Sequence, residues 1–425
     1  MQTSRSRTVL SAGLLLLVSS ASGENWPQWR GPHFNGSTTE TKLPATFSPT
    51  ENVLWQANLP GAGGSTPIVW DGHVFLTAQE TPSKDLWAIC LSGDSGKVLW
   101  RKAMGTGFAN RQGNTGASPS AITDGKTVWF YFGTGELAAF DFAGTPRWRR
   151  NIATDHGPFE ILWNYGATGL LYGGKLYVPV IHGAMRARGP AGGKSFLLCI
   201  DPATGKDLWK RPRPSAAPAE AKQAYTTPIP FEAAGRKCVL LTGADHVTAH
   251  DPATGEETWR SPNYNPRKDR NYRTVVSPVV ADGRVAVCPP RGARVLYAAS
   301  VGAKEWAWEK RAPSPDVCTP LYYRDKLFVL AGIRKQMLCL DPKTGKTLWE
   351  GDLGGRAVFQ ASPTGADGKV YCINMNGEAV VLSAGDRFEV LHRAAMGGKG
   401  VRSSIVAAGG RLYLRTDTKL YCFGT

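Results

Sequence analysis

The chain has 425 residues, of which 50 are lysine or arginine and 34 are aspartate or glutamate, so its formal net charge is +16. Only 20% of the residues are charged, while 49 are glycine and 29 are proline, a composition that suits turn-rich β structure. No long linker or low-complexity run divides the chain, which argues against a second domain. The positive charge does not indicate nucleic acid, because the sequence lacks any recognised nucleic-acid module.

Residues 1–23 have the three parts of a secretory signal peptide. Arg5 and Arg7 form a basic head, Val9 to Val18 is apolar, and small residues lead to Gly23. The apolar run is too short to span a bilayer, and no cysteine near the cleavage site offers a place for a lipid. A buried core segment is the alternative interpretation. We therefore expect a periplasmic or secreted protein, after removal of the signal peptide, with no transmembrane segment.

Residues 24–50 form a predicted N-terminal extension. The stretch Trp26-Pro-Gln-Trp-Arg-Gly-Pro32 is rich in aromatic residues and turn formers but lacks the alternation of a strand. We expect it to pack across the outside or one face of the fold, with ligand contact as the alternative. Asn52–Leu59, which follows, indicates a single strand that carries Trp55.

From Thr66 onwards the chain is a series of predicted β-hairpins. In the first, two apolar runs flank Asp71-Gly72, a strong short-range signal for a hairpin turn. The same arrangement of Ser or Thr, Pro, apolar run and turn recurs at Ser118-Pro119, Ser277-Pro278, Thr319-Pro320 and Ser362-Pro363.

A second hairpin follows each of these and is marked by a repeated phrase, Cys199-Ile-Asp-Pro-Ala-Thr-Gly-Lys-Asp-Leu-Trp209. Its first residues end a strand, Asp-Pro-x-Thr-Gly makes a turn, and the tryptophan anchors the returning strand. Close copies start at Ala249 and Cys339. Looser copies run over Cys90–Trp100, Ala139–Trp148, Ala298–Trp308 and Val381–Leu391.

Two hairpins make a four-stranded unit, and its repetition at roughly 40 to 60 residues is typical of a β-propeller blade. Seven complete units start near residues 66, 118, 168, 227, 277, 319 and 362, and an eighth starts at Ser403 but ends without its returning strand. Because an open ring would leave exposed edges, we predict that Asn52–Leu59 completes it. The sequence thus predicts an all-β, eight-bladed β-propeller of four-stranded antiparallel blades over residues 51–425.

The phrase resembles the tryptophan-docking repeat, Ala-x-Asp-x-x-x-Gly-Lys-x-x-Trp, of the PQQ-like (quinoprotein alcohol dehydrogenase-like) β-propellers. That family includes quinoprotein dehydrogenases and a non-enzymatic branch with the outer-membrane assembly factor BamB. The resemblance covers the chain from about residue 51 to its end and implies the propeller fold. It does not imply an activity, because the family holds enzymes and non-enzymes alike. Lys304 and Arg387 depart from the pattern by replacing the turn glycine.

Eight cysteines in an exported protein raise the question of disulfides. Four of them occupy one position of the repeat, each in a different blade, where other blades have alanine or valine, so we expect these to be packing residues: Cys90, Cys199, Cys339 and Cys422. One bridge among the other four stays open: Cys238, Cys288, Cys318 and Cys372.

Propellers bind ligands at one mouth of the channel, which is built by the connections between blades and by the middle turn of each blade. Basic residues outnumber carboxylates in those segments, so we expect a basic mouth that attracts anions, with a merely solvated basic rim as the alternative. The candidate ligand-binding residues are Arg111, Asn114, Trp163, Asn164, Tyr165, Tyr225, Arg270, Tyr272, Arg273, Asp316, Gln360 and Arg402.

An enzyme is the alternative that the resemblance implies. Quinoprotein dehydrogenases hold PQQ over the mouth, with Ca²⁺ on Glu, Asn and Asp, and Glu160, Asn164 and Asp316 stand at comparable places with Trp163 as an aromatic floor. The chain lacks the adjacent cysteine pair and the long insertions of those enzymes. A hydride-abstracting site also needs an ionised base and several oxygens for its cation, and carboxylates are scarce here. We therefore predict no catalytic residues, and PQQ and Ca²⁺ only under this alternative.

No other constellation indicates catalysis, and a metal site of His156, His182 and His246 competes with three ordinary surface histidines. The sequence thus favours a monomeric, exported, non-catalytic scaffold. We expect it to bind protein partners in the cell envelope or an acidic ligand, and no nucleic acid.

Overall fold

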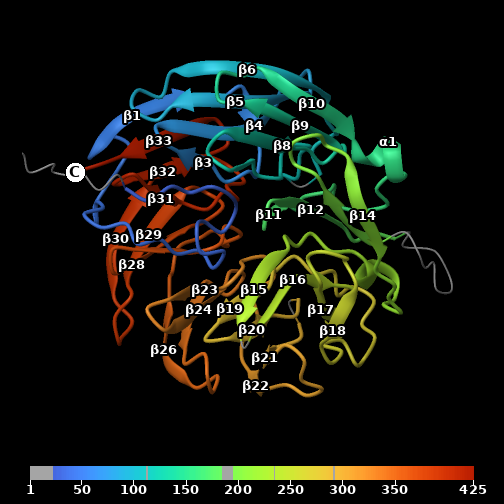
Figure 1. The fold of residues 1–425 in the computed structure, drawn as a ribbon. Coiled ribbons are helices and arrows are strands. Elements are labelled where there is room, and N and C mark those ends of the chain that lie inside the picture. Colours follow the sequence, from blue (N-terminus) through green and yellow to red (C-terminus); the bar gives the residue numbers. More distant parts are fainter. Residues whose placement is uncertain (1–22, 112, 184–194, 234, 291) are drawn as a thin grey trace, which may run out of the picture.

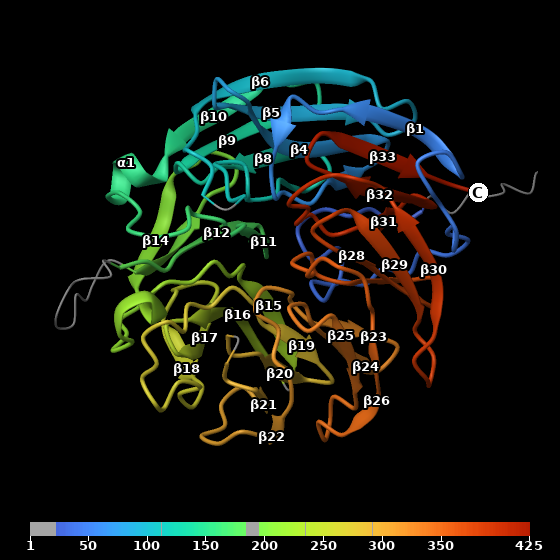
Figure 2. The same cartoon turned by 180° about the vertical axis from the view of Figure 1, so that it is seen from behind.

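The computed structural model describes residues 23–425 except residues 112, 184–194, 234 and 291, so all but the last residue of the predicted signal peptide lies outside it. Eight sheets stand side by side around a central axis (Figures 1 and 2). The predicted all-β, eight-bladed β-propeller is therefore confirmed. Within the described ranges no helix is long and apolar enough to cross a membrane.

The first four blades follow the chain, each from its innermost strand outwards. Blade 1 has β3 (Ile68–Trp70), β4 (His73–Glu80), β5 (Asp85–Ser92) and β6 (Val98–Thr106), with β2 (Gly61–Ala62) also paired to β4. Blade 2 has β7 (Ile122–Thr123), β8 (Thr127–Tyr131), β9 (Glu136–Asp141) and β10 (Pro146–Asn151), followed by α1 (Ile152–His156). Blade 3 has β11 (Leu170–Tyr172), β12 (Lys175–Val180), β13 (Phe196–Ile200) and β14 (Asp207–Pro212). A 3₁₀ turn, η1 (Ala219–Lys222), precedes blade 4, with β15 (Ile229–Ala233), β16 (Arg236–Gly243), β17 (His246–His250) and β18 (Glu257–Arg260).

The other four blades repeat this order. Blade 5 has β19 (Val279–Ala281), β20 (Arg284–Val287), β21 (Val295–Ala299) and β22 (Trp308–Arg311). Blade 6 has β23 (Leu321–Tyr323), β24 (Lys326–Ala331), β25 (Gln336–Leu340) and β26 (Thr347–Asp352). Blade 7 has β27 (Thr364–Ala366), β28 (Lys369–Ile373), β29 (Glu378–Ser383) and β30 (Val390–Ala395). Blade 8 has β31 (Val406–Ala408), β32 (Arg411–Arg415) and β33 (Lys419–Phe423), and β1 (Val53–Asn58) is its outermost strand.

The ring closes where the first strand meets the last. In Figure 1 the blue β1 lies beside the red β33, and the two pair antiparallel with Trp55 opposite Cys422. Cys199 faces Trp209 in the same way within blade 3. Two segments from opposite ends of the chain therefore rebuild one copy of the repeat, as predicted.

Six of the eight blades are joined to the next blade by a hydrogen bond from the tryptophan of their outermost strand. The indole nitrogen of Trp100 donates to the carbonyl of Phe142, in the outer turn of blade 2, at 2.8 Å. Gly205 shows why such turns favour glycine, since its φ is +72° and a Cβ there would lie 2.6 Å from the Trp148 ring. The same hydrogen bond runs from Trp55 to Gly93, Trp148 to Pro202, Trp259 to Ala303, Trp308 to Pro342, and Trp349 to Gly385.

Blade 3 departs from this scheme. The buried indole nitrogen of Trp209 has no hydrogen-bond partner among the described residues. In the turn of blade 4 that Trp209 faces, the Pro252 carbonyl accepts a hydrogen bond from the hydroxyl of Tyr177 instead.

Blade 7 corrects one detail of the sequence alignment. We aligned Leu391 with the tryptophan, but the register places His392 opposite Val381, the position that tryptophan has in the other blades. No outer turn follows on blade 8, because its two outer strands come from the two ends of the chain. His392 instead contacts Phe47 of the N-terminal extension, whose carbonyl lies 2.7 Å from Nε2.

The extension crosses one end of the ring along the turns of the inner hairpins. Trp26 pairs with Val69 of blade 1 through two backbone hydrogen bonds, of 2.8 and 3.0 Å. The carbonyl of Pro27 accepts from Thr123 of blade 2, at 2.9 Å. Further contacts reach blade 3 from Gln28, blades 6 and 7 from Arg30, blade 7 from Gly36 and Thr38, and blade 8 from Glu40. One short segment thus ties together blades from both halves of the chain, and its packing across one face agrees with the prediction.

Arg30 is the centre of this segment and is only 2% exposed. Its guanidinium donates to the carbonyls of Pro320 at 2.7 Å, Pro363 at 3.1 Å and Asn35 at 3.1 Å. Burial lowers the pKa of Arg30 to about 9, so the side chain is still charged at neutral pH. Gly36 allows the approach, since its φ is +89° and any Cβ would overlap the guanidinium.

All eight cysteines are buried and free. The four repeat-position cysteines lie in the cores between adjacent sheets, which fits the packing role that we predicted. Burial raises the pKa of Cys90 to about 12, which keeps its thiol protonated. The bridge left open among the other four is not formed.

We expect Trp100→Phe to lower the free energy of unfolding by about 1 kcal/mol more than Trp209→Phe. Both changes remove an indole that is partly exposed, but only Trp100 loses a hydrogen bond. Denaturant titrations of the two variants measure the difference. Equal losses would show that the tryptophans act through packing alone.

We expect Arg30→Met to lower the free energy of unfolding by about 3 kcal/mol, because it leaves three carbonyls inside the protein without their donor. The matched control is Lys42→Met, an exposed position of the same extension, for which we expect a change within about 0.5 kcal/mol. Calorimetric melting of both variants tests this. A similar small loss in both would mean that the extension does not stabilise the ring.

Candidate functional site

A belt of hydroxyl groups surrounds the central axis. At seven junctions between blades, the backbone N–H of one belt residue donates to the hydroxyl oxygen of the next, at 2.9 to 3.2 Å. Each hydroxyl that accepts in this way keeps its own proton to donate. The belt consists of Thr66, Ser120, Thr168, Thr227, Ser277, Thr319, Ser362 and Ser404.

The belt shows that our sequence alignment of blade 2 with blade 1 was wrong at one position. We aligned Ser118 with Thr66, but Ser120 occupies the belt position in blade 2. The recurrence of Ser or Thr before the innermost strand was visible in the sequence. Only the ring geometry shows that these residues meet around one axis.

Above the belt lies a pocket of about 630 Å³. Trp29 of the extension also lines it, so the extension forms the bottom of the pocket at the opposite end from the inter-blade connections. For the stretch that contains Trp29 we predicted packing, with ligand contact as the alternative. Besides the belt, the lining has four aromatic, four amide and five charged side chains: Trp29, Trp163, Tyr225 and Tyr272; Asn114, Asn164, Asn271 and Gln360; Glu220, Asp269, Arg273, Asp316 and Arg402.

Nine of the twelve predicted ligand-binding residues line this pocket, and whether they bind a ligand stays a prediction: Asn114, Trp163, Asn164, Tyr225, Tyr272, Arg273, Asp316, Gln360 and Arg402. Three do not line it. Arg111 is exposed and donates to the Leu162 carbonyl at 2.7 Å. Tyr165 is buried, with its hydroxyl bonded to the Pro179 carbonyl, and Arg270 is exposed outside the lining.

The pocket is not basic inside. Three carboxylates and two arginines line it, so the excess of positive charge that we predicted for the mouth is not confirmed there. Two of these carboxylates, Glu220 and Asp269, were not among the predicted residues. Glu220 follows the proline-rich stretch after β14, and neither residue belongs to a motif.

At the centre of the lining, Arg273 lies between two carboxylates. Its Nε is 3.6 Å from Glu220 and its Nη2 is 3.6 Å from Asp316. Both distances exceed an ordinary hydrogen bond. Trp163 also contacts Glu220, through an indole N–H bond of 2.8 Å. The three charged groups therefore attract one another but keep hydrogen-bonding capacity for a ligand.

The connection that carries Arg273 is anchored to the middle turn of blade 4. The side chain of Asn265 donates to Asp245 at 3.0 Å and to the Asp269 carbonyl at 3.0 Å. The hydroxyls of Tyr264 and Thr274 lie 2.8 Å apart. Burial raises the pKa of Asp245 to about 6. The loop is thus held at both ends by buried polar contacts.

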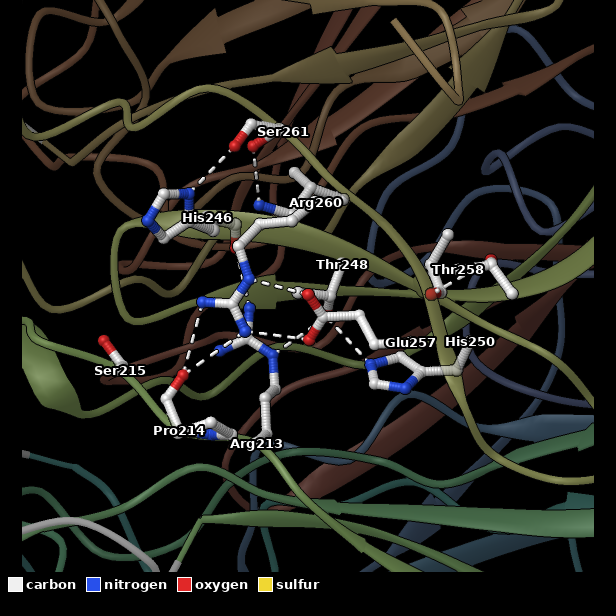
Figure 3. Close-up of polar contacts among 12 residues, drawn as sticks. Arg213, Pro214, Ser215, His246, Thr248, His250, Glu257, Thr258, Arg260 and Ser261 are labelled. Atoms are coloured by element: carbon white, nitrogen blue, oxygen red, sulfur yellow. Dashed lines mark hydrogen bonds and ion pairs between the residues drawn. The ribbon is translucent and has the colours of Figure 1, made fainter. Parts of the chain in front are cut away.

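Below that turn, Arg213 enters blade 4 from the end of blade 3 (Figure 3). Its guanidinium donates to the Thr248 hydroxyl and to the His246 carbonyl, both at 2.9 Å. Glu257 and Arg260 form a separate pair on β18, with two contacts of 2.7 and 2.8 Å. The two contacts of Arg213 join blade 4 to blade 3, where the tryptophan hydrogen bond is missing.

The three histidines considered as metal ligands have other partners. His156 lies 3.0 Å from Asp207, His182 accepts from the Glu160 N–H at 2.9 Å, and Nδ1 of His246 lies 2.9 Å from the Ser261 carbonyl. Among the residues that the structure describes, no group of three or more His, Cys, Asp and Glu side chains could hold a metal ion.

The closed ring of eight blades, joined by tryptophans of a repeated phrase, defines a β-propeller of the PQQ-like class. The chain belongs to the family described as "Outer membrane protein assembly factor BamB", whose model matches residues 34–178 and 307–423, more than half of the chain. No curated protein matches the sequence.

Solved structures share the fold at low sequence identity. BamB from Moraxella catarrhalis has a TM-score of 0.60 at 15% identity, over 87% of this chain and 98% of that chain. The quinohemoprotein alcohol dehydrogenase of Comamonas testosteroni has a TM-score of 0.68 at 13% identity, over 94% of this chain and 81% of that chain. A europium-containing methanol dehydrogenase has a TM-score of 0.52 at 10% identity, over 95% of this chain and 98% of that chain. Dehydrogenases and BamB are thus both similar in fold, which leaves function to the site.

Asp245 predicts a pH dependence. Its folded-state pKa of about 6 lies above the ordinary 3.8, so the folded protein holds this proton more tightly. Its contribution to stability is present below about pH 4 and is lost as the pH rises through about 6. Asp245→Asn should therefore be more stable than the wild type at pH 7, by on the order of 2 kcal/mol, with little difference at pH 4.

Unfolding titrations from pH 4 to 7 measure this difference. Asp251→Asn in the same blade is the control of opposite sign, because backbone N–H groups of Thr254 and Ala253 hold the pKa of Asp251 below its usual value. That variant should lose stability at pH 7 and little at low pH. A pH-independent effect of Asp245→Asn would contradict the assignment.

Proposed function

We propose that this protein is an exported, non-catalytic propeller that binds an acidic protein surface in the cell envelope through its inter-blade connections. The observation that carries the proposal is the difference between the two ends of the ring. The N-terminal extension crosses the face formed by the hairpin turns, called here the hairpin-turn face, whereas the connections between blades surround the pocket mouth at the other end. Membership of the BamB family supports a protein-binding role and residence in the envelope.

The charge of these connections is uneven. The connections between blades 1 and 2, 4 and 5, 6 and 7, and 7 and 8 contain eight basic residues and one acidic residue. Six of the basic residues are exposed: Arg111, Arg267, Lys268, Arg270, Arg356 and Lys399. Glu160, Glu220 and Asp316 lie in the other connections. Recognition of acidic groups therefore belongs to these exposed loops rather than to the mixed-charge pocket, and it should weaken with salt.

The triple variant Arg267→Ser, Lys268→Ser, Arg270→Ser tests this proposal. We expect it to bind a poly-glutamate peptide about tenfold more weakly than the wild type, as measured by fluorescence anisotropy at low salt. The control removes three positive charges from the hairpin-turn face, by Lys206→Ser, Lys343→Ser and Lys346→Ser, all of which are exposed.

The control should bind the peptide as the wild type does. When the mature proteins are used to capture partners from a native envelope extract, the wild type and the control should again bind more than the triple variant. Equal weakening in both variants would show that only net charge matters and would overturn the proposed face.

A PQQ- and Ca²⁺-dependent dehydrogenase is the alternative, and the described residues do not fit its metal site. Asn164 and Asp316 line the pocket, but Glu160 does not. Asp316 lies beside the cationic Arg273, which would repel Ca²⁺. The proposal of a non-catalytic protein would fail if PQQ and Ca²⁺ produced dye reduction with simple alcohols or aldoses.

A further inference from the structure

We infer that the pocket at the channel mouth binds a neutral saccharide, independently of any partner on the surrounding loops. A volume of about 630 Å³ lies in the range of roughly 300 to 1,000 Å³ that small-molecule sites occupy. The lining combines aromatic rings with amides, hydroxyls and charges of both signs. A sugar ring offers an apolar face for the rings and hydroxyls, each both donor and acceptor, for the polar groups.

The charged centre of the pocket selects against charged ligands. Glu220 and Asp316 flank Arg273, so an anion gains one cation but meets two carboxylates. Asp269 adds a third carboxylate to the lining and Arg402 a second cation. A neutral ligand avoids the cost of leaving a charge unbalanced in a partly desolvated site.

Unused hydrogen-bonding capacity points to hydroxyl groups. Asp316 is 8% exposed, and its Oδ1 has no hydrogen-bond partner among the described residues. Buried polar atoms are rarely left unpaired, and the Asp316 carboxylate reaches the pocket lining. Arg273 lies 3.6 Å from each carboxylate, and no hydrogen bond to another described residue occupies its guanidinium. Of two neighbouring hydroxyls on one sugar ring, one can donate to the Asp316 carboxylate while the other accepts from the Arg273 guanidinium.

Aromatic side chains add a surface for the ring itself. Trp163 lines the pocket and is oriented by its hydrogen bond to Glu220, so its indole is held next to the charged centre. Trp29 forms the bottom and Tyr272 lies on the same connection as Arg273. Rigid aromatic faces of this kind bind apolar surface at little cost in side-chain entropy. The hydroxyl groups of the belt can donate hydrogen bonds to oxygen atoms of the ligand.

The test is direct binding of glucose, galactose, N-acetylglucosamine and the disaccharides cellobiose, lactose and chitobiose. Glucuronate, glycine and lysine serve as charged competitors. Saturation-transfer NMR and tryptophan fluorescence should show at least one neutral saccharide binding with a Kd on the order of 1 mM or tighter. The charged compounds should not bind.

Asp316→Asn keeps the shape of the side chain but removes its charge, and it should weaken that binding about tenfold. Trp163→Leu should weaken it as well. Asp282→Asn, in a hairpin turn of the opposite face, is the control and should bind as the wild type does. The melting temperature of Asp316→Asn verifies that it is folded.

Three results would overturn the inference: no saturable binding by any neutral saccharide, binding by the charged compounds alone, or wild-type affinity in Asp316→Asn. Binding by glycine or lysine would assign the pocket to a zwitterion or an ammonium group instead. Each of these results leaves the poly-glutamate experiment unaffected, so the two proposals fail separately.

Discussion

The pairing of β1 with β33 is the interaction on which the whole architecture depends. It turns a row of seven sheets and an incomplete eighth into a closed ring, and it brings Trp55 opposite Cys422, as Trp209 lies opposite Cys199 in blade 3. Closure removes the two open edges. It also sets the axis around which the hydroxyl belt and the pocket are arranged, because neither exists in a single blade.

The N-terminal extension gives the two faces of the ring different roles. A propeller of similar blades has two comparable channel ends. Here Arg30 and its neighbours occupy one end, and Trp29 becomes part of the pocket that opens at the other. The buried Arg30 fixes the segment that carries Trp29, so the contacts that hold the extension on the ring also position a residue of the pocket.

Charge is divided between two levels of the mouth. Six exposed basic residues lie on the connections, whereas the pocket below places Arg273 between Glu220 and Asp316. Long-range attraction of an acidic surface and short-range recognition of a neutral ligand can therefore coexist on one face. Net charge alone, at +16, describes only the first of these.

The sequence by itself determined the class of fold, the number of blades and the closing strand, because hairpin turns and the anchoring tryptophan are local signals that recur with the repeat. It also named nine residues of the pocket lining, since the connections between blades follow from the same register. It could not show that Glu220 and Asp316 flank Arg273, that Trp29 lines the pocket, or that His392 takes the tryptophan position in blade 7. Those facts depend on distances between different blades, and only the closed ring fixes these distances.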